Sequence, residues 1–113
     1  MNALKNKVQL IGNLGKDPEI ITLESGKKLA KFSIATNEVY KNSAGEKVTD
    51  TQWHNLVAWN KTAEIVEKYV TKGKEIMIEG KLTSRSYETS TGDKRYITEV
   101  IVNELLMLSY NKN

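Results

Sequence analysis

The sequence predicts an all-β protein that contains a single helix and folds as a small barrel. Short segments in which apolar and polar residues alternate recur along the chain, and polar or glycine-containing turns separate them. Only residues 60–70 show the three- and four-residue apolar spacing of an amphipathic helix. A chain of 113 residues, 39% of them hydrophobic, is large enough for one core. We therefore expect a single domain over residues 1–113.

The first half of the chain contains two or three predicted strands and a surface ribbon. Alternation over residues 7–11 predicts the first strand, and residues 19–23 either continue it or form a short second strand. Residues 30–36 alternate strictly, which predicts a half-buried strand with Phe32 pointing inward. Residues 38–50 are too polar for a core element and too long for a tight turn, so we expect a protruding loop or extended ribbon. Turns are predicted at residues 25–28, 43–45 and 89–93.

Residues 51–59 form the next predicted strand, and alternation divides them between two faces. One face carries Trp53, Asn55, Val57 and Trp59, and the other carries His54, Leu56 and Ala58. Indole presents a large flat apolar surface that any nucleobase can cover, so the tryptophan face is suited to base stacking. The alternative is that the two tryptophans cover a contact between subunits. The asparagine between them and the nearby Lys61 favour bases.

The predicted helix begins at Asn60, because asparagine is a favoured residue type at helix N-caps. Its apolar residues recur at helical spacing, and Tyr69 is expected on the face that packs on the core. Residues 72–74 end the helix, since glycine adopts the left-handed cap conformation and lysines are favoured at the negative end of the helix dipole.

A long hairpin and an apolar strand complete the chain. Residues 75–88 and 94–99 are the two arms of the hairpin, and residues 100–108 are apolar enough for a strand covered on both faces. Three strands, one helix and two more strands follow the order of an OB-fold, a five-stranded Greek-key barrel with a helix between strands 3 and 4. Here the barrel also carries long protruding hairpin loops. Periodicity alone leaves an SH3-like barrel or a small sandwich open, and the single helix favours the OB-fold.

Residue types needed for catalysis or metal binding are sparse and scattered. The absence of cysteine excludes disulfides, thiolate metal sites and cysteine nucleophiles. His54 is the one histidine, and neither a Ser-His-Asp triad nor a paired-carboxylate or metal-ligand spacing can be assembled around it. We therefore expect no enzyme activity, no metal and no cofactor, with His54 satisfied in the core or in a subunit contact. Residues 12–16 superficially resemble a phosphate-binding loop, but the missing Lys-Ser/Thr ending favours a structural bulge.

Aromatic and cationic residues recur together along the sequence. The pairs are Tyr40 with Lys41, Trp59 with Lys61, Arg85 with Tyr87, and Lys94 and Arg95 with Tyr96. Stacking tolerates any base and cations follow the phosphates, so such a surface is expected to prefer single strands, whose bases are free. Tyr96 and Tyr110 are equally suited to packing. No segment resembles a signal peptide or a membrane span, which predicts a cytoplasmic protein with no membrane partner.

Motifs in the same order along nearly the whole chain carry a resemblance to a known family. The longest are Ile11-Gly12-Asn13-Leu14-Gly15-Lys16-Asp17-Pro18-Glu19, Phe32-Ser33-Ile34-Ala35-Thr36, Trp53-His54-Asn55-Leu56-Val57, Ile78-Glu79-Gly80-Lys81-Leu82 and Arg95-Tyr96-Ile97-Thr98-Glu99-Val100. With these motifs the chain resembles the bacterial-type single-stranded DNA-binding proteins, which are homotetramers of OB-folds. The resemblance implies the same fold and assembly here.

The resemblance also implies which residues bind. Family positions that stack on DNA bases correspond to Tyr40, Trp53, Trp59 and Tyr87. Family positions that meet phosphates correspond to Lys7, Lys61, Lys72, Arg85 and Arg95. Tyrosine replaces the usual tryptophan at the first and last stacking positions, Trp59 replaces a common phenylalanine, and Asn55 occupies a usually basic site. The family histidine at the position of His54 contributes to subunit assembly, which implies a subunit interface.

The function implied is sequence-independent binding of single-stranded DNA during replication, recombination and repair, by a homotetramer associated with the nucleoid. The family's flexible linker and acidic C-terminal tip do not follow Asn113, so we expect a shortened chain or a naturally short relative, for instance of phage or plasmid origin. Replication and repair proteins are expected as partners only if the native protein has that tip. Two alternatives are a primosomal or phage OB-fold accessory protein acting mainly through protein contacts, and an OB-fold RNA-binding chaperone.

Overall fold

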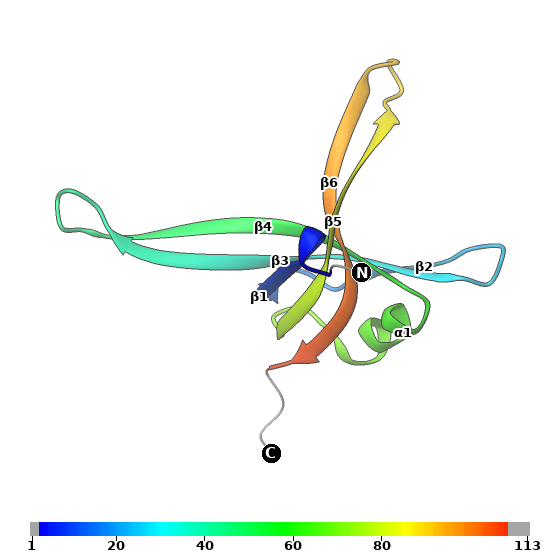
Figure 1. Cartoon of the computed structure of the whole chain (residues 1–113), viewed down its shortest axis with the longest axis horizontal. Helices are drawn as coiled ribbons and strands as arrows, with labels where there is room; N and C mark the ends of the chain where they lie inside the picture. Colours follow the sequence, from blue (N-terminus) through cyan, green and yellow to red (C-terminus); the bar gives the residue numbers. More distant parts are fainter. Residues whose placement is uncertain (1–2, 109–113) are drawn as a thin grey trace.

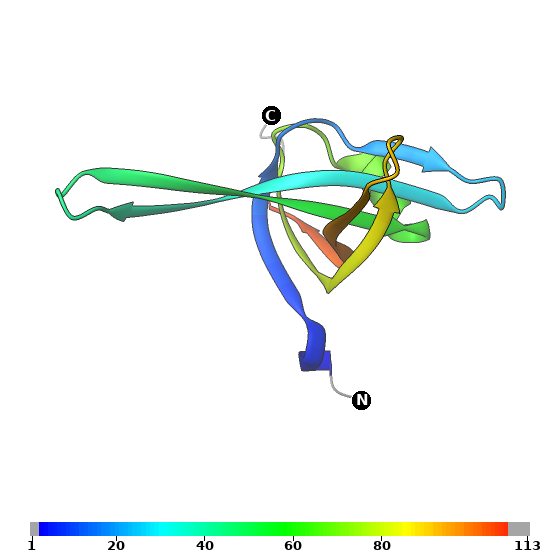
Figure 2. The same cartoon turned by 90° about the horizontal axis from the view of Figure 1, so that it is seen from above.

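In the part of the chain that the structure describes, six strands, one α-helix and a short 3₁₀ helix build a barrel from which three arms extend (Figure 1). The computed structural model describes residues 3–108. In chain order the elements are η1 (Ala3–Asn6), β1 (Val8–Leu14), β2 (Glu19–Thr22), β3 (Lys28–Lys41), β4 (Lys47–Trp59), α1 (Asn60–Tyr69), β5 (Glu75–Glu88) and β6 (Lys94–Met107). Figure 2 shows the same arms from above, with the β3–β4 ribbon reaching far beyond the barrel.

Five of the strands close the barrel. The sheet order is β1-β5-β6-β4-β3, and pairing of β1 with β3 joins the two ends of that order. The β4–β6 pair is parallel, and the other barrel pairs are antiparallel. The short β2 lies outside the ring and pairs with β3 alone, so it is a separate short strand. The predicted OB-fold is confirmed, with α1 between the third and fourth strands of the ring.

The polar segment predicted as a loop or ribbon is a two-stranded ribbon. Strands β3 and β4 stay paired without interruption from Leu29 opposite Trp59 to Lys41 opposite Lys47. At the tip, the Asn42 side-chain oxygen accepts hydrogen bonds from the backbone N–H groups of Ala44 and Glu46, at 2.9 and 3.0 Å. The Asn42 side chain therefore replaces strand pairing where the chain reverses.

Strand β1 continues beyond the point at which the sequence predicts an end or bulge. Its pairing with β5 is regular through Gly12 and Asn13, and it then turns to pair with β3 at Asn13 and Leu14. A Cβ at Gly12 would overlap the backbone carbonyl oxygen of Ala35 in β3. The glycine therefore permits the close crossing of β1 and β3 that closes the barrel, rather than forming a bulge.

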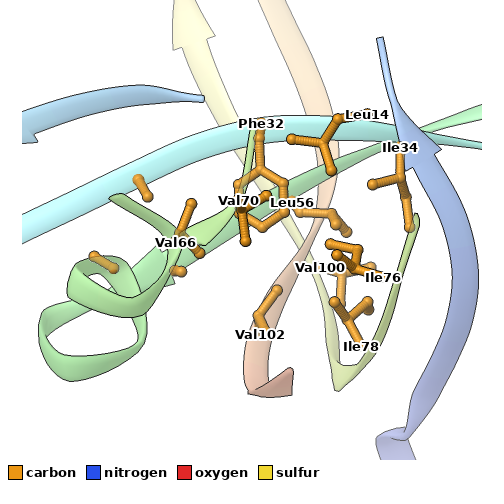
Figure 3. Close-up of a cluster of buried hydrophobic side chains, with 13 residues drawn as sticks. Leu14, Phe32, Ile34, Leu56, Val66, Val70, Ile76, Ile78, Val100 and Val102 are labelled. Atoms are coloured by element: carbon orange, nitrogen blue, oxygen red, sulfur yellow. The ribbon is translucent and has the colours of Figure 1, made fainter. Parts of the chain in front are cut away.

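The core fills the barrel and continues under α1 (Figure 3). Ile34, Leu56 and Ile76 are at most 1% exposed, and Ala63 and Val66 on α1 are fully buried beside them. Helix α1 covers one end of the barrel through this stripe. Removal of so much aliphatic surface from water is the main stabilising contribution to the fold.

Three predictions about α1 are wrong. The helix ends at Tyr69 with Val70 as an extended C-cap, and Gly73 lies in the turn that follows rather than at the cap. Tyr69 is 58% exposed, because Ala63 and Val66 define the buried stripe and Tyr69 lies to one side of it. Asn60 is not the N-cap: it is the first helical residue, with a φ of 54°, and Trp59 holds the cap position without a side-chain hydrogen bond.

A hydrogen bond also joins α1 to β3. The Glu67 carboxylate accepts it from Lys28 and raises the pKa of that lysine.

The last arm of the predicted hairpin and the apolar C-terminal segment form one strand, β6. A bulge at Glu79/Gly80 marks where β5 and β6 change register. The prediction that the final segment is covered on both faces is wrong for the single chain, since Val100 and Val102 are buried whereas Leu106 is 58% exposed.

Candidate nucleic-acid interface

Strand β4 presents both tryptophans on one face. Trp53 is 59% exposed and Trp59 is 38% exposed, whereas Leu56 and Ala58 on the opposite face are buried in the core. The alternation predicted for this strand is therefore confirmed. Residues directly opposite each other in a ladder share a face, so Lys31 of β3 lies beside Val57 between the two tryptophans.

A groove of about 550 Å³ opens between this face and the β5–β6 hairpin. Its polar lining consists of Lys16, Asp17, Glu19, Lys31, Ser33, Asn55, Arg85 and Glu99. A smaller hollow continues to Trp59, and another lies beside Trp53. The hollows are therefore arranged along the same face as the two indole rings.

The charges that line the groove balance. The cations are Lys16, Lys31 and Arg85, and the carboxylates are Asp17, Glu19 and Glu99. Equal numbers of opposite charges give no net field that draws a polyanion into the groove itself. Stacking on the exposed rings and the placement of single cations are therefore the two ways in which this surface can hold a nucleic acid.

Arg85 and Glu99 form an ion pair in the wall of the groove. The Arg85 Nε–H donates to the Glu99 Oε1 at 2.9 Å. Among the residues that the structure describes, Glu99 is the one buried charged residue, at 9% exposure, whereas the Arg85 side chain is 48% exposed. The sequence gives no indication of this, because a glutamate in a strand is usually a solvent-facing residue.

Trp53 packs against Gly15, which follows β1. A Cβ placed on Gly15 would lie 2.6 Å from the indole Cη2 of Trp53 and 2.8 Å from its Cζ3. The absence of a side chain at Gly15 therefore gives the indole its position. The sequence points to a structural role for this glycine but not to its contact with a tryptophan in a distant part of the chain.

The remaining predicted stacking residues lie on the two arms. Tyr87 on β5 is 47% exposed and stands directly opposite Arg95 on β6, on the face of the hairpin that also carries Arg85. Tyr40 is 52% exposed near the tip of the β3–β4 ribbon. Its position in the alternation places it on the ribbon face opposite to that of Trp53, so the fold does not bring it into the groove.

The other predicted cations lie outside the groove lining. Lys7 pairs with Glu79 at 3.4 Å, and Lys61 is exposed in the first turn of α1. Lys72 is exposed, and its backbone N–H donates to the Asp17 carboxylate at 2.8 Å, which ties the turn after α1 to the segment after β1. These cations are spread around the barrel rather than gathered at one point.

His54 is half-buried on the core side of β4, where its Nε2 and the Thr36 hydroxyl lie 3.0 Å apart. Within residues 3–108, no group of three or more histidine, aspartate and glutamate side chains is arranged to hold a metal ion. No helix in the same part of the chain is long and apolar enough to cross a membrane.

Fold and surface together define an OB-fold barrel with an exposed aromatic face beside a polar groove. The family model described as "Single-strand binding protein family" matches residues 5–108, and the chain belongs to this family. The chain is 45% identical to Single-stranded DNA-binding protein 1 of Chlorobaculum tepidum over 91% of its length. It is 46% identical to the Single-stranded DNA-binding protein of Bacteroides thetaiotaomicron over 92% of its length. The chain spans 64% and 66% of the lengths of these two relatives.

A solved structure has the same fold along its whole length. The structure described as a Plasmodium falciparum SSB complex with ssDNA superposes with a TM-score of 0.84 at 35% identity. The match covers 96% of this chain and 100% of that one.

Proposed function

We propose that this protein binds single-stranded DNA without sequence preference, and that it protects and organises exposed strands during replication, recombination and repair. The observation that carries the proposal is the exposure of Trp53 and Trp59 on one face of β4, beside a groove that also contains Arg85. The names of the relatives support it, as does the similarity to a protein whose structure is a complex with ssDNA.

Stacking on these rings needs bases that are not already stacked on one another. A duplex hides its bases, whereas a single strand exposes them to aromatic side chains at about 1–3 kcal/mol per base. In this proposal Tyr40 and Tyr87 add stacking on the arms, and phosphates are bound by Lys7, Lys61, Lys72, Arg85 and Arg95.

The proposed working form is a homotetramer, with His54 at a subunit interface and with binding rather than catalysis as its activity. Exposed aliphatic side chains outside the groove support an assembly, among them Ile11 at 49% and Leu106 at 58% exposure. Sedimentation equilibrium tests this part: four chains of 12.8 kDa are expected, and a dimer would favour an accessory protein acting through protein contacts. The proposed location is the cytoplasm, in association with the nucleoid.

The substitution Trp53→Ala tests the stacking mode. We expect it to lower affinity by about 1–3 kcal/mol for every DNA composition, because indole stacks on any base. The measurement is fluorescence anisotropy of labelled dT, dC and dA oligonucleotides of equal length, with an RNA of the same length alongside. Tyr69→Ala is the matched control, since Tyr69 is equally exposed but lines neither the groove nor the hollows beside the tryptophans. A loss confined to one base would contradict the stacking mode, and tighter binding of the RNA would identify an RNA chaperone instead.

A further inference from the structure

A buried carboxylate is unexpected in the wall of a groove that is to hold a polyanion. Glu99 lines the main groove and also both smaller hollows, the one beside Trp53 and the one beside Trp59. A DNA strand that contacts both tryptophans therefore passes the Glu99 carboxylate. Burial of a charge costs free energy unless the charge is paired, and its negative sign also repels phosphate.

The geometry of the pair indicates what Glu99 does. Its Oε1 accepts from Nε of Arg85 and not from the terminal guanidinium nitrogens. An arginine has five N–H donors, so this bond leaves the four terminal N–H groups of Arg85 for another acceptor. A phosphate is well matched to the terminal groups, which present two donors in a planar fork.

Arg85 would have many conformations without this partner. It lies on β5 where the hairpin leaves the barrel, and its side chain is 48% exposed. Glu99 lies on β6 directly opposite Thr83 of β5, and its carboxylate is held within the sheet at 11% side-chain exposure. The Glu99 carboxylate is therefore a rigid acceptor that fixes the Nε of Arg85, while the side chain that carries the terminal guanidinium nitrogens is partly exposed to solvent.

We propose that Glu99 is a positioning residue, which holds the Arg85 guanidinium so that its terminal N–H groups meet a phosphate between the two tryptophan sites. This inference rests on the proposed function. It assigns to a residue of the groove a role that depends on its hydrogen bond rather than on its charge. An unpaired arginine loses rotamer freedom on binding, and Glu99 removes that cost beforehand.

Three variants separate the hydrogen bond from the charge. Glu99→Gln keeps an oxygen that accepts from Nε and removes the charge, whereas Glu99→Ala and Glu99→Met remove both. Methionine fills the space that alanine leaves, so a loss shared by both is not due to a cavity. Glu19→Gln is the matched control, because Glu19 lines the same groove and is exposed on β2.

The experiment is a titration of labelled dT oligonucleotide with each variant, alone and combined with Arg85→Ala. Thermal unfolding is recorded in parallel to show that each variant is folded. Arg85→Ala is expected to weaken binding about tenfold, the scale of one charge-assisted hydrogen bond. Glu99→Ala and Glu99→Met are expected to weaken it roughly threefold to tenfold, with Glu99→Gln close to the parent protein. In the Arg85→Ala background, none of the three substitutions of Glu99 is expected to weaken binding further.

Other results would overturn the inference. Tighter binding by all three Glu99 variants, to the extent seen for Glu19→Gln, would mean that Glu99 acts only as an unfavourable charge. An equal loss with and without Arg85 would mean that Glu99 acts through the fold. Failure of the parent protein to bind the oligonucleotide would instead contradict the proposed function itself, and the inference would fail with it.

Discussion

Single residues decide how the aromatic face is presented, and Gly15 is the clearest case. Its neighbour is the outer edge of the Trp53 indole, which is 59% exposed and free to rotate away. Gly15 is not among the glycines that have a positive φ, so an alanine is compatible with its backbone. A substitution here therefore acts on the indole rather than on the fold.

Gly15→Ala is expected to leave the thermal midpoint nearly unchanged while it lowers affinity for single-stranded DNA. The added methyl group overlaps the indole and displaces it, so part of the stacking, worth about 1–3 kcal/mol per base, is lost. Unfolding curves and DNA titrations of the same preparation check this. A large drop in stability, or unchanged affinity, would show that the contact with Trp53 does not set the position of the ring.

At this scale the sequence predicts which way a side chain points but not what it contacts. Alternation in residues 51–59 is enough to place both tryptophans on the solvent face, because a core on the other face fixes the register. Tyr69 is predicted wrongly because an aromatic residue next to the buried stripe of a helix resembles a core residue. The partner of Gly15 comes from a distant part of the chain, and no local pattern encodes it. The partner of Arg85 lies across the predicted hairpin, 14 residues away, but the hairpin pattern does not show which side chains pair.

At the scale of elements, the barrel depends on glycines where two strands approach closely. A Cβ at Gly80 in β5 would overlap the backbone carbonyl oxygen of Ile101 in β6, next to the bulge. Unlike the indole beside Gly15, a backbone carbonyl in a paired strand cannot move aside. Gly80 therefore contributes to stability through the space that it leaves.

Gly80→Ala is expected to destabilise the fold by about 1–3 kcal/mol or more, the range for overpacking a tight site. Urea unfolding followed by circular dichroism measures the change, with Gly15→Ala as the control that adds the same methyl group beside a movable side chain. If the two variants are equally stable, the close approach of β5 and β6 does not constrain the barrel.

The elements themselves are largely predictable from the sequence, and their lengths are not. Alternation identifies β1, β3, β4 and the first part of β5, whereas β6 is predicted from its place after a turn and from the apolar run of residues 100–108. The glycine-containing turns at Gly26, Gly45 and Gly92 all have positive φ. For the polar segment 38–50 the sequence does not decide between a loop and a ribbon, since exposed paired strands have no apolar face. Composition also divides β6 in two. Its first half is paired in an exposed arm and is polar, whereas its second half is apolar, yet the two halves form one continuous strand.

At the scale of the molecule, the chain joins a compact core to three arms, and the groove lies where the β5–β6 arm meets the β3–β4 face. The order of strands and helix predicts this architecture, because the single helix between the third and fourth barrel strands favours an OB-fold over an SH3-like barrel or a sandwich. The proposed assembly cannot be predicted from the order of the elements in the same way. The exposed Ile11 and Leu106 become apparent only when the barrel is closed and its outer surface can be examined.

The measurement that tests the central claim most directly is the intrinsic fluorescence of Trp53 and Trp59 during titration with poly-dT, and then with a duplex of equal length, over a series of salt concentrations. Stacking predicts strong quenching by the single strand alone. Affinity is expected to fall as salt rises, with a log–log slope of about −0.7 for each phosphate neutralised. Absence of quenching, or an equal response to the duplex, would contradict the claim that this face binds the bases of single-stranded DNA.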